Sequence, residues 1–312
     1  MCFRWVVVVV VFLGGCGKRE ALVMEGEAMG MRWRVQVAGG EEAGIREEVL
    51  RVMNGWEMAA SLWREDSEIA QVNREPEGKW IKLGERLWSA VAQAREVARE
   101  TDGALDITIG PLVGMWGFGL EGGRESPSKQ DIQRVLSRCG WRHLEFDDEG
   151  CLIRKLTARV ELNVNGVVEG LALEELARGL RAKGYRDFLL EIGGELLAAG
   201  RSTTGKPWIV AVQVPGGGAK ESFSMMPLSD MSLATSGTYR HRKVEEGKDF
   251  SHLIDPVTGR PVAHQLTSVS VMDGNCGRAD GFATALLVMG PEKGRAVAER
   301  LGLRVIWIEA VK

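Results

Sequence analysis

Residues 251–261 read SHLIDPVTGRP and residues 279–284 read ADGFAT, and both stretches place polar side chains among glycine and apolar residues where a plain core would not need them. Asp280 and Thr284 are four residues apart, so on a helix their oxygens lie on one face. Carboxylate and hydroxyl oxygens suit a hard cation such as Mg²⁺. The structural alternative is that Asp280 caps a helix and that Thr284 bonds its own backbone.

A second stretch lies upstream, where residues 163–170 read NVNGVVEG and lead into a helical pattern that continues to about Lys183. A glycine-flanked turn at a helix N-terminus presents free backbone N–H groups and the positive end of the helix dipole, which fits a pyrophosphate. The residues match neither the GxxxxGKS/T loop nor the GxGxxG turn. This stretch alone does not identify a nucleotide site.

Two earlier stretches carry further polar residues. Residues 61–73 read SLWREDSEIAQVN, in which Asp66 and Ser67 have a plain structural explanation as helix caps. Residues 101–119 read TDGALDITIGPLVGMWGFG. Carboxylates among glycines and aromatic rings suit a pocket that binds a ring and hydroxyl groups, so this stretch predicts a small-molecule site.

The composition is that of an ordinary globular protein. Of the 312 residues, 45% are hydrophobic and 27% are charged. The formal net charge of −3 excludes a basic nucleic-acid surface as the main theme, so no nucleic-acid partner is expected. The 40 glycines follow no collagen-like period, which predicts many tight turns or close backbone approaches.

Hydrophobic periodicity predicts helices and strands that do not alternate regularly. Apolar residues at spacings of three and four predict helices, which we place at 41–60, 85–100, 128–138, 167–183, 278–289 and 291–301. Short β-branched or aromatic runs predict strands at 33–37, 188–192, 208–214, 268–272 and 304–308. This pattern favours a mixed α+β architecture over a doubly wound parallel sheet, with a surface loop at 120–130.

The first residues form a leader rather than part of the fold. Arg4 precedes the apolar run 6–13, and Gly14-Gly15-Cys16 follows, which is the order of a secretory signal peptide too short to span a bilayer. Residues 13–16 also resemble a bacterial lipobox. We therefore expect removal of residues 1–15 and a lipid on Cys16, which would anchor the mature chain to the non-cytoplasmic side of a bacterial membrane. The alternative is ordinary secretion, with Cys16 incidental.

The cysteines beyond the leader are Cys139, Cys151 and Cys276. Their odd number and the absence of CxxC spacing argue against zinc and iron–sulfur sites. One disulfide with one free thiol fits an oxidising compartment, and buried reduced thiols are the alternative.

Taken in order along residues 29–290, the chain resembles the ApbE-like FAD:protein FMN transferases. The motifs that carry the resemblance are Met29-Gly30 before a strand, the stretches above, EIGGE at 191–195, TSGTYR at 235–240 and ADGFATALLVMG at 279–290. The resemblance implies that residues 16–312 form one α+β, T-shaped domain with mixed sheets and surrounding helices. It also implies a Mg²⁺-dependent enzyme that breaks the pyrophosphate of FAD, joins FMN through a phosphoester to a Thr hydroxyl of an acceptor protein, and releases AMP.

Three groups of residues receive roles from this resemblance. A metal site is implied at Asp280, Thr284 and the backbone carbonyl of Gly166. A pocket for the flavin or adenine is implied at Met29, Trp63, Asp106 and Thr108, with Glu169 at the helix turn. His252 and Asp255 are implied near the reacting phosphates, where either is a candidate base; His252 could instead orient a phosphate or the Asp280 carboxylate.

The chain departs from the family pattern at Met31, where Thr usually follows Met-Gly, at Asn163, where Asp is common, and at Glu169, where many members have Lys. A carbonyl ligand needs no particular side chain, so the metal site is unaffected. The expected acceptor carries a D-x-x-S/T-A/G-T-like sequence. A second interpretation is a FAD-binding or FAD-hydrolysing lipoprotein that yields free FMN and AMP, and a third is a non-enzymatic lipoprotein scaffold.

If Cys16 is lipidated, Cys16→Ser leaves the protein unanchored, because an acyl chain contributes about 0.8 kcal/mol per buried methylene. No other stretch approaches the roughly 18 apolar residues that a membrane span needs. The measurement is membrane fractionation after feeding labelled palmitate. Wild-type protein that is found only in the soluble fraction, without label, would contradict the expectation.

Overall fold

The computed structural model describes residues 21–39, 41–118, 126–214, 222–239, 242–245 and 248–310. The predicted leader with Cys16, and most of the predicted loop at 120–130, lie outside the described residues. The described chain is a mixed α+β fold, as predicted, and its strand pairings are antiparallel. None of its helices is long and apolar enough to cross a membrane.

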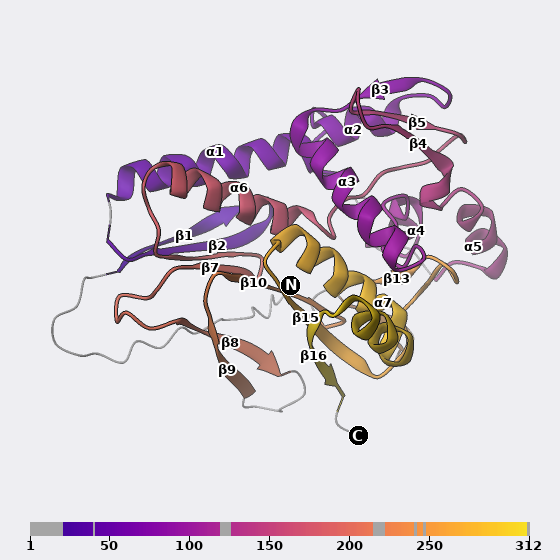
Figure 1. The fold of residues 1–312 in the computed structure, drawn as a ribbon. Helices are drawn as coiled ribbons and strands as arrows, with labels where there is room; N and C mark the ends of the chain where they lie inside the picture. Colours follow the sequence, from indigo (N-terminus) through magenta and orange to yellow (C-terminus); the bar gives the residue numbers. More distant parts are fainter. Residues whose placement is uncertain are drawn as a thin grey trace.

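A seven-stranded sheet forms the centre of the molecule (Figure 1). In spatial order its strands are β1 (Leu22–Ala28), β2 (Met31–Val37), β6 (Phe188–Ile192), β7 (Glu195–Ala199), β10 (Met231–Gly237), β15 (Leu266–Asp273) and β16 (Arg304–Glu309). Strands β2, β6, β15 and β16 confirm four of the predicted strands. The first and last strands of the described chain, β1 and β16, therefore form opposite edges of the sheet.

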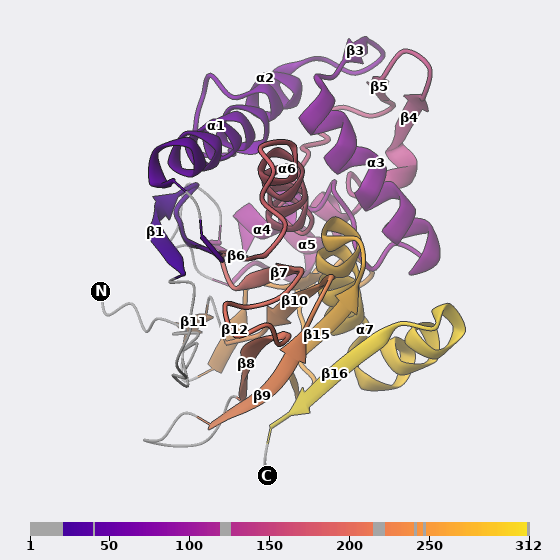
Figure 2. The same ribbon diagram turned by 60° about the vertical axis from the view of Figure 1, so that its left-hand side comes forward.

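Helices cover one face of this sheet (Figures 1 and 2). Helices α1 (Glu42–Ala60), α6 (Val168–Ala182) and α7 (Cys276–Leu301) contact the strands, and α3 (Glu85–Glu100) packs on all three helices. Their apolar stripes are buried, and in α1 the buried set includes the residues whose spacing predicted the helix: Ile45, Val49, Val52, Met53 and Trp56. Alternate strand residues such as Leu190 and Ile192 complete this core.

A hairpin covers the opposite face of the sheet (Figure 2). It consists of β8 (Trp208–Val214), which confirms the predicted strand, and β9 (Ser222–Leu228). Trp208 and Val210 are buried against Leu189, Leu196 and Leu233 of the sheet. Successive residues of one strand therefore point to opposite faces of the sheet: Leu190 is buried under the helices and Leu189 under the hairpin.

A second group of elements extends from the helical side (Figure 1). It comprises β3 (Trp80–Lys82), β4 (Leu144–Asp147) and β5 (Leu152–Lys155), the helices α2 (Glu68–Arg74), α4 (Gly110–Met115), α5 (Lys129–Leu136) and η1 (Trp141–His143), and the hairpin of β13 (Ile254–Asp255) and β14 (Arg260–Pro261). A further hairpin pairs β11 (Arg242–Glu245) with β12 (Lys248–Ser251). Leu112, Trp116, Ile132 and Ile254 form a separate small core that joins α4, α5 and β13.

All three cysteines of the described chain are free. Burial raises the pKa of the Cys139 thiol to about 12, and it raises the pKa of Cys276 well above its usual range. These thiols are therefore neutral, and Cys276 packs as a small apolar side chain at the start of α7.

Helix α7 is two helices joined at a kink, as the sequence predicted. Gly290 adopts φ 76° and ψ 178°, and Pro291 has no N–H to offer the Leu287 carbonyl four residues earlier. The His264 ring supplies the missing donor, because its Nε2 lies 2.7 Å from the Leu287 oxygen. A donor at this position requires the hydrogen on Nε2, so His264 stabilises the kink from outside the helix.

His264→Ala leaves the Leu287 carbonyl without this donor in a partly buried position, so we expect the free energy of unfolding to fall by about 1 kcal/mol. His264→Gln is the matched variant, since its amide N–H can approach the same oxygen and recover part of the loss. Urea unfolding of both variants and the wild type is the measurement. Equal stability of His264→Ala and the wild type would show that the hydrogen bond to the kink contributes nothing.

Candidate functional site

The four polar stretches of the sequence are joined by specific contacts around the start of α6. Asn73, at the end of α2, joins the first stretch to the third through both ends of its amide. Its Nδ2 donates to the Leu162 carbonyl at 3.0 Å, and its Oδ1 accepts the Leu162 N–H at 2.7 Å. Each such bond contributes on the order of 1 kcal/mol. Asn73 therefore fixes the backbone that leads into α6.

The second and third stretches meet at Asn163, whose N–H donates to the Ile107 carbonyl at 2.7 Å. The Asn163 side chain shapes the turn that follows, because its Oδ1 accepts the N–H of Asn165 at 3.1 Å. An asparagine keeps the acceptor oxygen that an aspartate would offer here. The departure from the family pattern at Asn163 thus leaves the turn intact.

Asp106 and Thr108 form a buried pair that holds the neighbouring chain. Asp106 Oδ1 accepts the Thr108 N–H at 2.8 Å and the Thr108 hydroxyl at 2.7 Å. Asp106 Oδ2 accepts the Trp141 N–H at 3.1 Å, and Thr108 Oγ1 accepts the Gly140 N–H at 2.6 Å. In this structure the two residues implied for the ring pocket are engaged in positioning residues 140–141.

The third and fourth stretches meet where α6 crosses α7. Asp280 is 5% exposed, and its Oδ2 accepts the N–H of Gly170, in the first turn of α6, at 3.1 Å. A Cβ placed on Gly166 would lie 3.6 Å from Thr284 Oγ1, so the turn before α6 lies against that hydroxyl. The structure thus places the Asp280 carboxylate and the Thr284 hydroxyl, two ligands that the family resemblance implied, against the start of α6 and the Gly166 turn before it.

The structural alternative for Asp280 and Thr284 takes an unexpected form. Asp280 does cap a helix, but it caps the neighbouring α6, where its charge faces the positive end of the α6 dipole. Its own helix is capped by Asn275, whose Oδ1 accepts the Arg278 N–H at 2.6 Å. The Thr284 hydroxyl lies 2.9 Å from the Ser236 hydroxyl on β10, away from its own backbone.

Glu169 lies beside the turn between β6 and β7. A Cβ on Gly193 would lie 3.6 Å from Glu169 Cγ and 2.8 Å from Met31 Sδ. Gly193 has φ 61°, and its N–H donates to the Arg32 carbonyl at 2.9 Å. The β1–β2 turn, the β6–β7 turn and the start of α6 therefore converge at one end of the sheet.

Met29 occupies a strained position in the β1–β2 turn. Met29 and Gly30 have φ 55° and 71°, the two-residue turn in which Asn-Gly is a favoured pair. For a residue other than glycine, this left-handed conformation costs about 1–2 kcal/mol of free energy. The turn itself accounts for this conformation, because both central residues of such a turn need a positive φ.

The second and fourth stretches meet through aromatic side chains. The rings of Phe118 and His252 lie edge to face with centroids 6.3 Å apart, and the Trp116 indole N–H donates to the Gly259 carbonyl at 2.8 Å. Gly259 has φ 65°, and a Cβ there would lie 2.7 Å from Ile132 Cγ2, so only glycine fits this approach. These contacts fix the loop that carries His252.

Asp255 uses its carboxylate within its own turn. One oxygen accepts the Val257 N–H and the other accepts the Thr258 hydroxyl, each at 2.9 Å. The Asp255 carbonyl also accepts the Gly259 N–H at 2.8 Å. The geometry of Asp255 is therefore that of a turn-forming residue.

Trp63 lies on the loop between α1 and α2 and is 66% exposed. Ser67 orders this loop: its hydroxyl donates to the Ser61 carbonyl at 2.6 Å and accepts the Ala70 N–H at 3.2 Å. Ser67 is thus the N-terminal cap of α2, which confirms the structural explanation that the sequence offered for it. Trp63 exposes its ring to solvent from an ordered loop.

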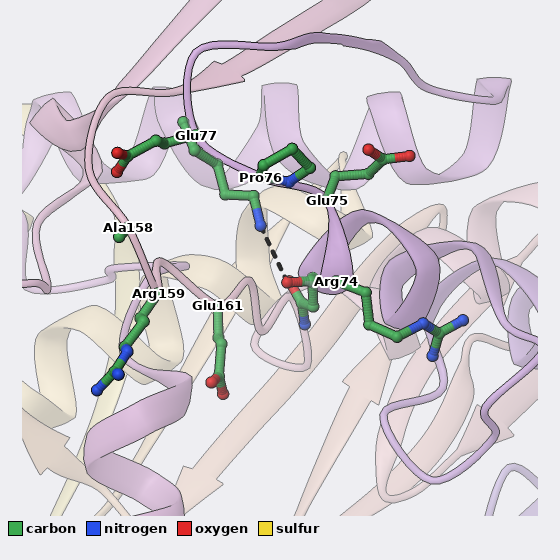
Figure 3. Close-up of a pocket in the computed structure, with 9 residues that line it drawn as sticks. Arg74, Glu75, Pro76, Glu77, Ala158, Arg159 and Glu161 are labelled. Carbon is green, nitrogen blue, oxygen red and sulfur yellow. Dashed lines mark hydrogen bonds between the residues drawn. The ribbon is translucent and has the colours of Figure 1, made fainter.

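A cavity of about 410 Å³ adjoins Asn73 (Figure 3). Its wall includes Lys155, whose ammonium donates to the Asn73 carbonyl at 3.0 Å and the Val160 carbonyl at 3.3 Å. Burial lowers the pKa of Lys155. The described residues that line this cavity include none of the implied metal, ring or phosphate residues, and Lys155 serves to join the end of α2 to the chain after β5.

The sequence assigned no role to Asn73 or Ser236, although both lie in quoted motifs. Their partners Leu162 and Thr284 are 89 and 48 residues away. No periodicity or local motif links residues over such separations. The only available signal is that each is a polar residue within a motif that the family resemblance already covered.

The fold and the site define a class of α+β protein in which oxygen donors and a helix N-terminus meet at one end of an antiparallel sheet. The ApbE family model matches residues 29–307. The chain is 33% identical to the FAD:protein FMN transferase of Klebsiella pneumoniae (strain 342), over 96% of this chain and 89% of that protein. It is 32% identical to the FAD:protein FMN transferase of Escherichia coli K12, over 93% of this chain and 84% of that protein.

Solved structures agree with these relatives. The flavin transferase ApbE of Vibrio cholerae superposes with a TM-score of 0.86 at 30% identity, over 94% of each chain. The apo flavinyl transferase ApbE of Pseudomonas stutzeri superposes with a TM-score of 0.87 at 32% identity, over 96% of this chain and 94% of that chain. The chain belongs to the ApbE family, which confirms the resemblance seen in its motifs.

Burial raises the pKa of the Asp106 carboxyl, although hydrogen bonds from Thr108 and Trp141 favour its ionised form. Asp106 therefore adds stability below its unfolded pKa of about 3.9, and this contribution is lost as pH rises through the folded pKa. Asp106→Asn removes the titration. As pH rises from about 4 to 7, the free energy of unfolding of the wild type should therefore fall relative to that of Asp106→Asn.

Urea unfolding of both proteins across this pH range is the measurement for Asp106. A constant difference would show that the three donors balance burial, and a wild type that gains stability relative to the variant with rising pH would show that they outweigh it.

Proposed function

We propose that this chain is a Mg²⁺-dependent FAD:protein FMN transferase that joins the FMN half of FAD to a Thr hydroxyl of an acceptor protein and releases AMP. The observation that carries the proposal is the meeting of Asp280, Thr284 and the Gly166 turn at the start of α6. The names of its relatives support transfer of FMN from FAD to protein. The metal, the Thr acceptor and the release of AMP rest on the site chemistry and on the motifs.

The donor set suits Mg²⁺. Asp280 offers a carboxylate, Thr284 a hydroxyl and Gly166 a carbonyl, which are the hard oxygen ligands that this ion prefers. Within the described residues, no three His, Cys, Asp or Glu side chains lie close enough together to hold a metal by themselves. Three protein oxygens would leave positions around the ion open for phosphate oxygens of FAD and for water. Bound there, Mg²⁺ would neutralise charge on the pyrophosphate as it breaks.

The start of α6 is suited to the phosphates of FAD. Its N-cap residue, Val167, makes no side-chain capping bond, and Asp280 takes the N–H of Gly170. The earlier N–H groups of the first turn and the positive end of the helix dipole favour an anion at this point. Asp280 thus fixes the helix end at the same place where it offers a ligand to the metal.

We assign the proton transfer to His252. As the acceptor Thr oxygen bonds to the phosphorus of the FMN half, its hydroxyl proton must leave, and the bond from that phosphorus to the bridging oxygen breaks so that AMP departs with this oxygen. His252 is half-buried on a loop fixed by aromatic contacts, whereas both Asp255 oxygens are used in their own turn. His252 therefore suits the base, and Asp255 shapes the loop that carries it.

The ring-binding side of the site combines Trp63 and Met29. The exposed Trp63 ring can stack on a planar ring, and the strained Met29 lies in the turn that adjoins the start of α6 through Met31 and Gly193. Asp106 and Thr108 act through residues 140–141, whose backbone N–H groups they bind. Glu169 lies in the first turn of α6, where we place the phosphates.

The lipid anchor on Cys16 and the non-cytoplasmic location are part of the proposal and rest on the leader sequence. A D-x-x-S/T-A/G-T-like sequence in the acceptor is proposed on the same footing. The same residues would serve hydrolysis if water took the place of the Thr hydroxyl, with free FMN and AMP as products.

Asp280→Ala is expected to lower FMN transfer at least about 100-fold, since a metal that stabilises charge in the transition state contributes several kcal/mol. FAD binding should fall much less, because the ring contacts persist. Asp280→Asn is the matched variant: its amide oxygen can still accept the Gly170 N–H, but the charge is gone. Thr284→Ala should lose less activity than either, since water can replace a neutral hydroxyl.

One assay tests these variants: covalent flavin on an acceptor peptide, seen by fluorescence on a denaturing gel across a Mg²⁺ series, with AMP measured in parallel. Transfer by Asp280→Asn at the wild-type rate and with wild-type Mg²⁺ dependence would overturn the metal assignment. AMP release by the wild type without flavin on the peptide would favour hydrolysis instead.

A further inference from the structure

A hydroxyl on the central sheet contacts the proposed metal ligand Thr284. Ser236 Oγ lies 2.9 Å from Thr284 Oγ1, and both residues are half-buried. Strand β10 packs against α7, and Ala234 of this strand is in the core that the two elements share. Because strand residues alternate in direction, Ser236 faces α7 as Ala234 does.

Either hydroxyl could be the donor in this contact, and binding of a metal by Thr284 would decide between the two directions. A hydroxyl that gives a lone pair to a cation must send its hydrogen elsewhere. A helical threonine commonly sends it to the carbonyl four residues earlier, which here belongs to Asp280. Ser236 Oγ, 2.9 Å from Thr284 Oγ1, offers that hydrogen an acceptor on β10 instead. If Ser236 Oγ accepts the Thr284 hydrogen, the lone pairs of Thr284 Oγ1 stay available to the metal.

We propose that Ser236 is a positioning residue of the metal site: its Oγ accepts the Thr284 hydrogen and fixes the orientation in which Thr284 binds Mg²⁺. The inference rests on the proposed function, because it takes the metal site at Asp280 and Thr284 as given. Removing the hydrogen-bond partner of a metal ligand typically weakens metal binding 10–100-fold. Since this ligand is neutral, Ser236→Ala is expected to weaken it about tenfold.

The same strand offers a matched control on its other face. Thr235 Oγ1 lies 2.7 Å from Ser270 Oγ, and the two residues are cross-strand partners in the β10–β15 pair. Thr235→Val removes a hydroxyl contact of the same kind from the adjacent position, but away from α7. It should leave metal affinity unchanged.

The experiment measures the affinity of the whole protein for Mn²⁺, used as a substitute for Mg²⁺, in the presence of saturating FAD. The electron paramagnetic resonance signal of the free ion reports how much Mn²⁺ remains unbound. A sample with FAD alone and the Asp280→Ala variant serve as blanks. Wild type, Ser236→Ala, Thr284→Ala and the double variant are compared. We expect the double variant to bind Mn²⁺ as Thr284→Ala does, because Ser236 acts only through the Thr284 hydroxyl.

The outcomes separate this inference from the function beneath it. Wild-type protein that binds no more Mn²⁺ than Asp280→Ala would overturn the metal site itself. Binding by the wild type, with Ser236→Ala equally tight, would overturn the role of Ser236 alone. So would a loss that persists in the Thr284→Ala background, or one that Thr235→Val shares. Thermal unfolding of each variant shows whether a loss of Mn²⁺ affinity comes from destabilisation of the sheet.

Discussion

The close approach of α6 and α7 depends on the lack of a side chain at Gly170. A Cβ there would lie 2.4 Å from the carbonyl oxygen of Cys276, a backbone atom that cannot move aside without shifting α7. This approach lets Asp280 reach the first turn of α6 and lays the Gly166 turn against Thr284. A larger residue at this crossing would separate the helices, and the site would come apart with them.

Much of the site is backbone that is held in place by side chains. Asn73 holds Leu162, Asn163 shapes its own turn, and Asp106 with Thr108 holds residues 140–141. Backbone N–H and C=O groups do not depend on residue type, so such a site tolerates substitutions that keep these holding contacts. Asn163 illustrates this, because its oxygen makes the turn that an aspartate would make.

The sequence predicted what is locally encoded and missed what tertiary packing creates. Gly290-Pro291 is a local signal, so the break in α7 was predictable, and the four-residue spacing of Asp280 and Thr284 placed them on one face. Strand β10 was not predicted, because its sequence MSLATSG lacks the β-branched run that identified other strands. Its place comes from pairing with β7 and β15.

The candidate site divides in the same way. The family resemblance implied that His252 and Asp255 of the motif SHLIDPVTGRP lie near the reacting phosphates, but both oxygens of Asp255 bond within the turn that the motif itself encodes. The contact of Ser236 with Thr284 spans two elements, and nothing in either segment alone identifies it.

The order of the strands also decides when during synthesis the site comes into being. Strand β2 pairs with β6, and the Gly166 turn and Thr284, both proposed to supply metal ligands, meet only after α7 has docked on β10 and β15. Contacts between such distant parts of a chain form late, because the entropy of closing long loops comes before their reward. A nascent chain that ends before α7 therefore carries no weakened version of the proposed metal site; it lacks the proposed site altogether, because Asp280 and Thr284 both belong to α7.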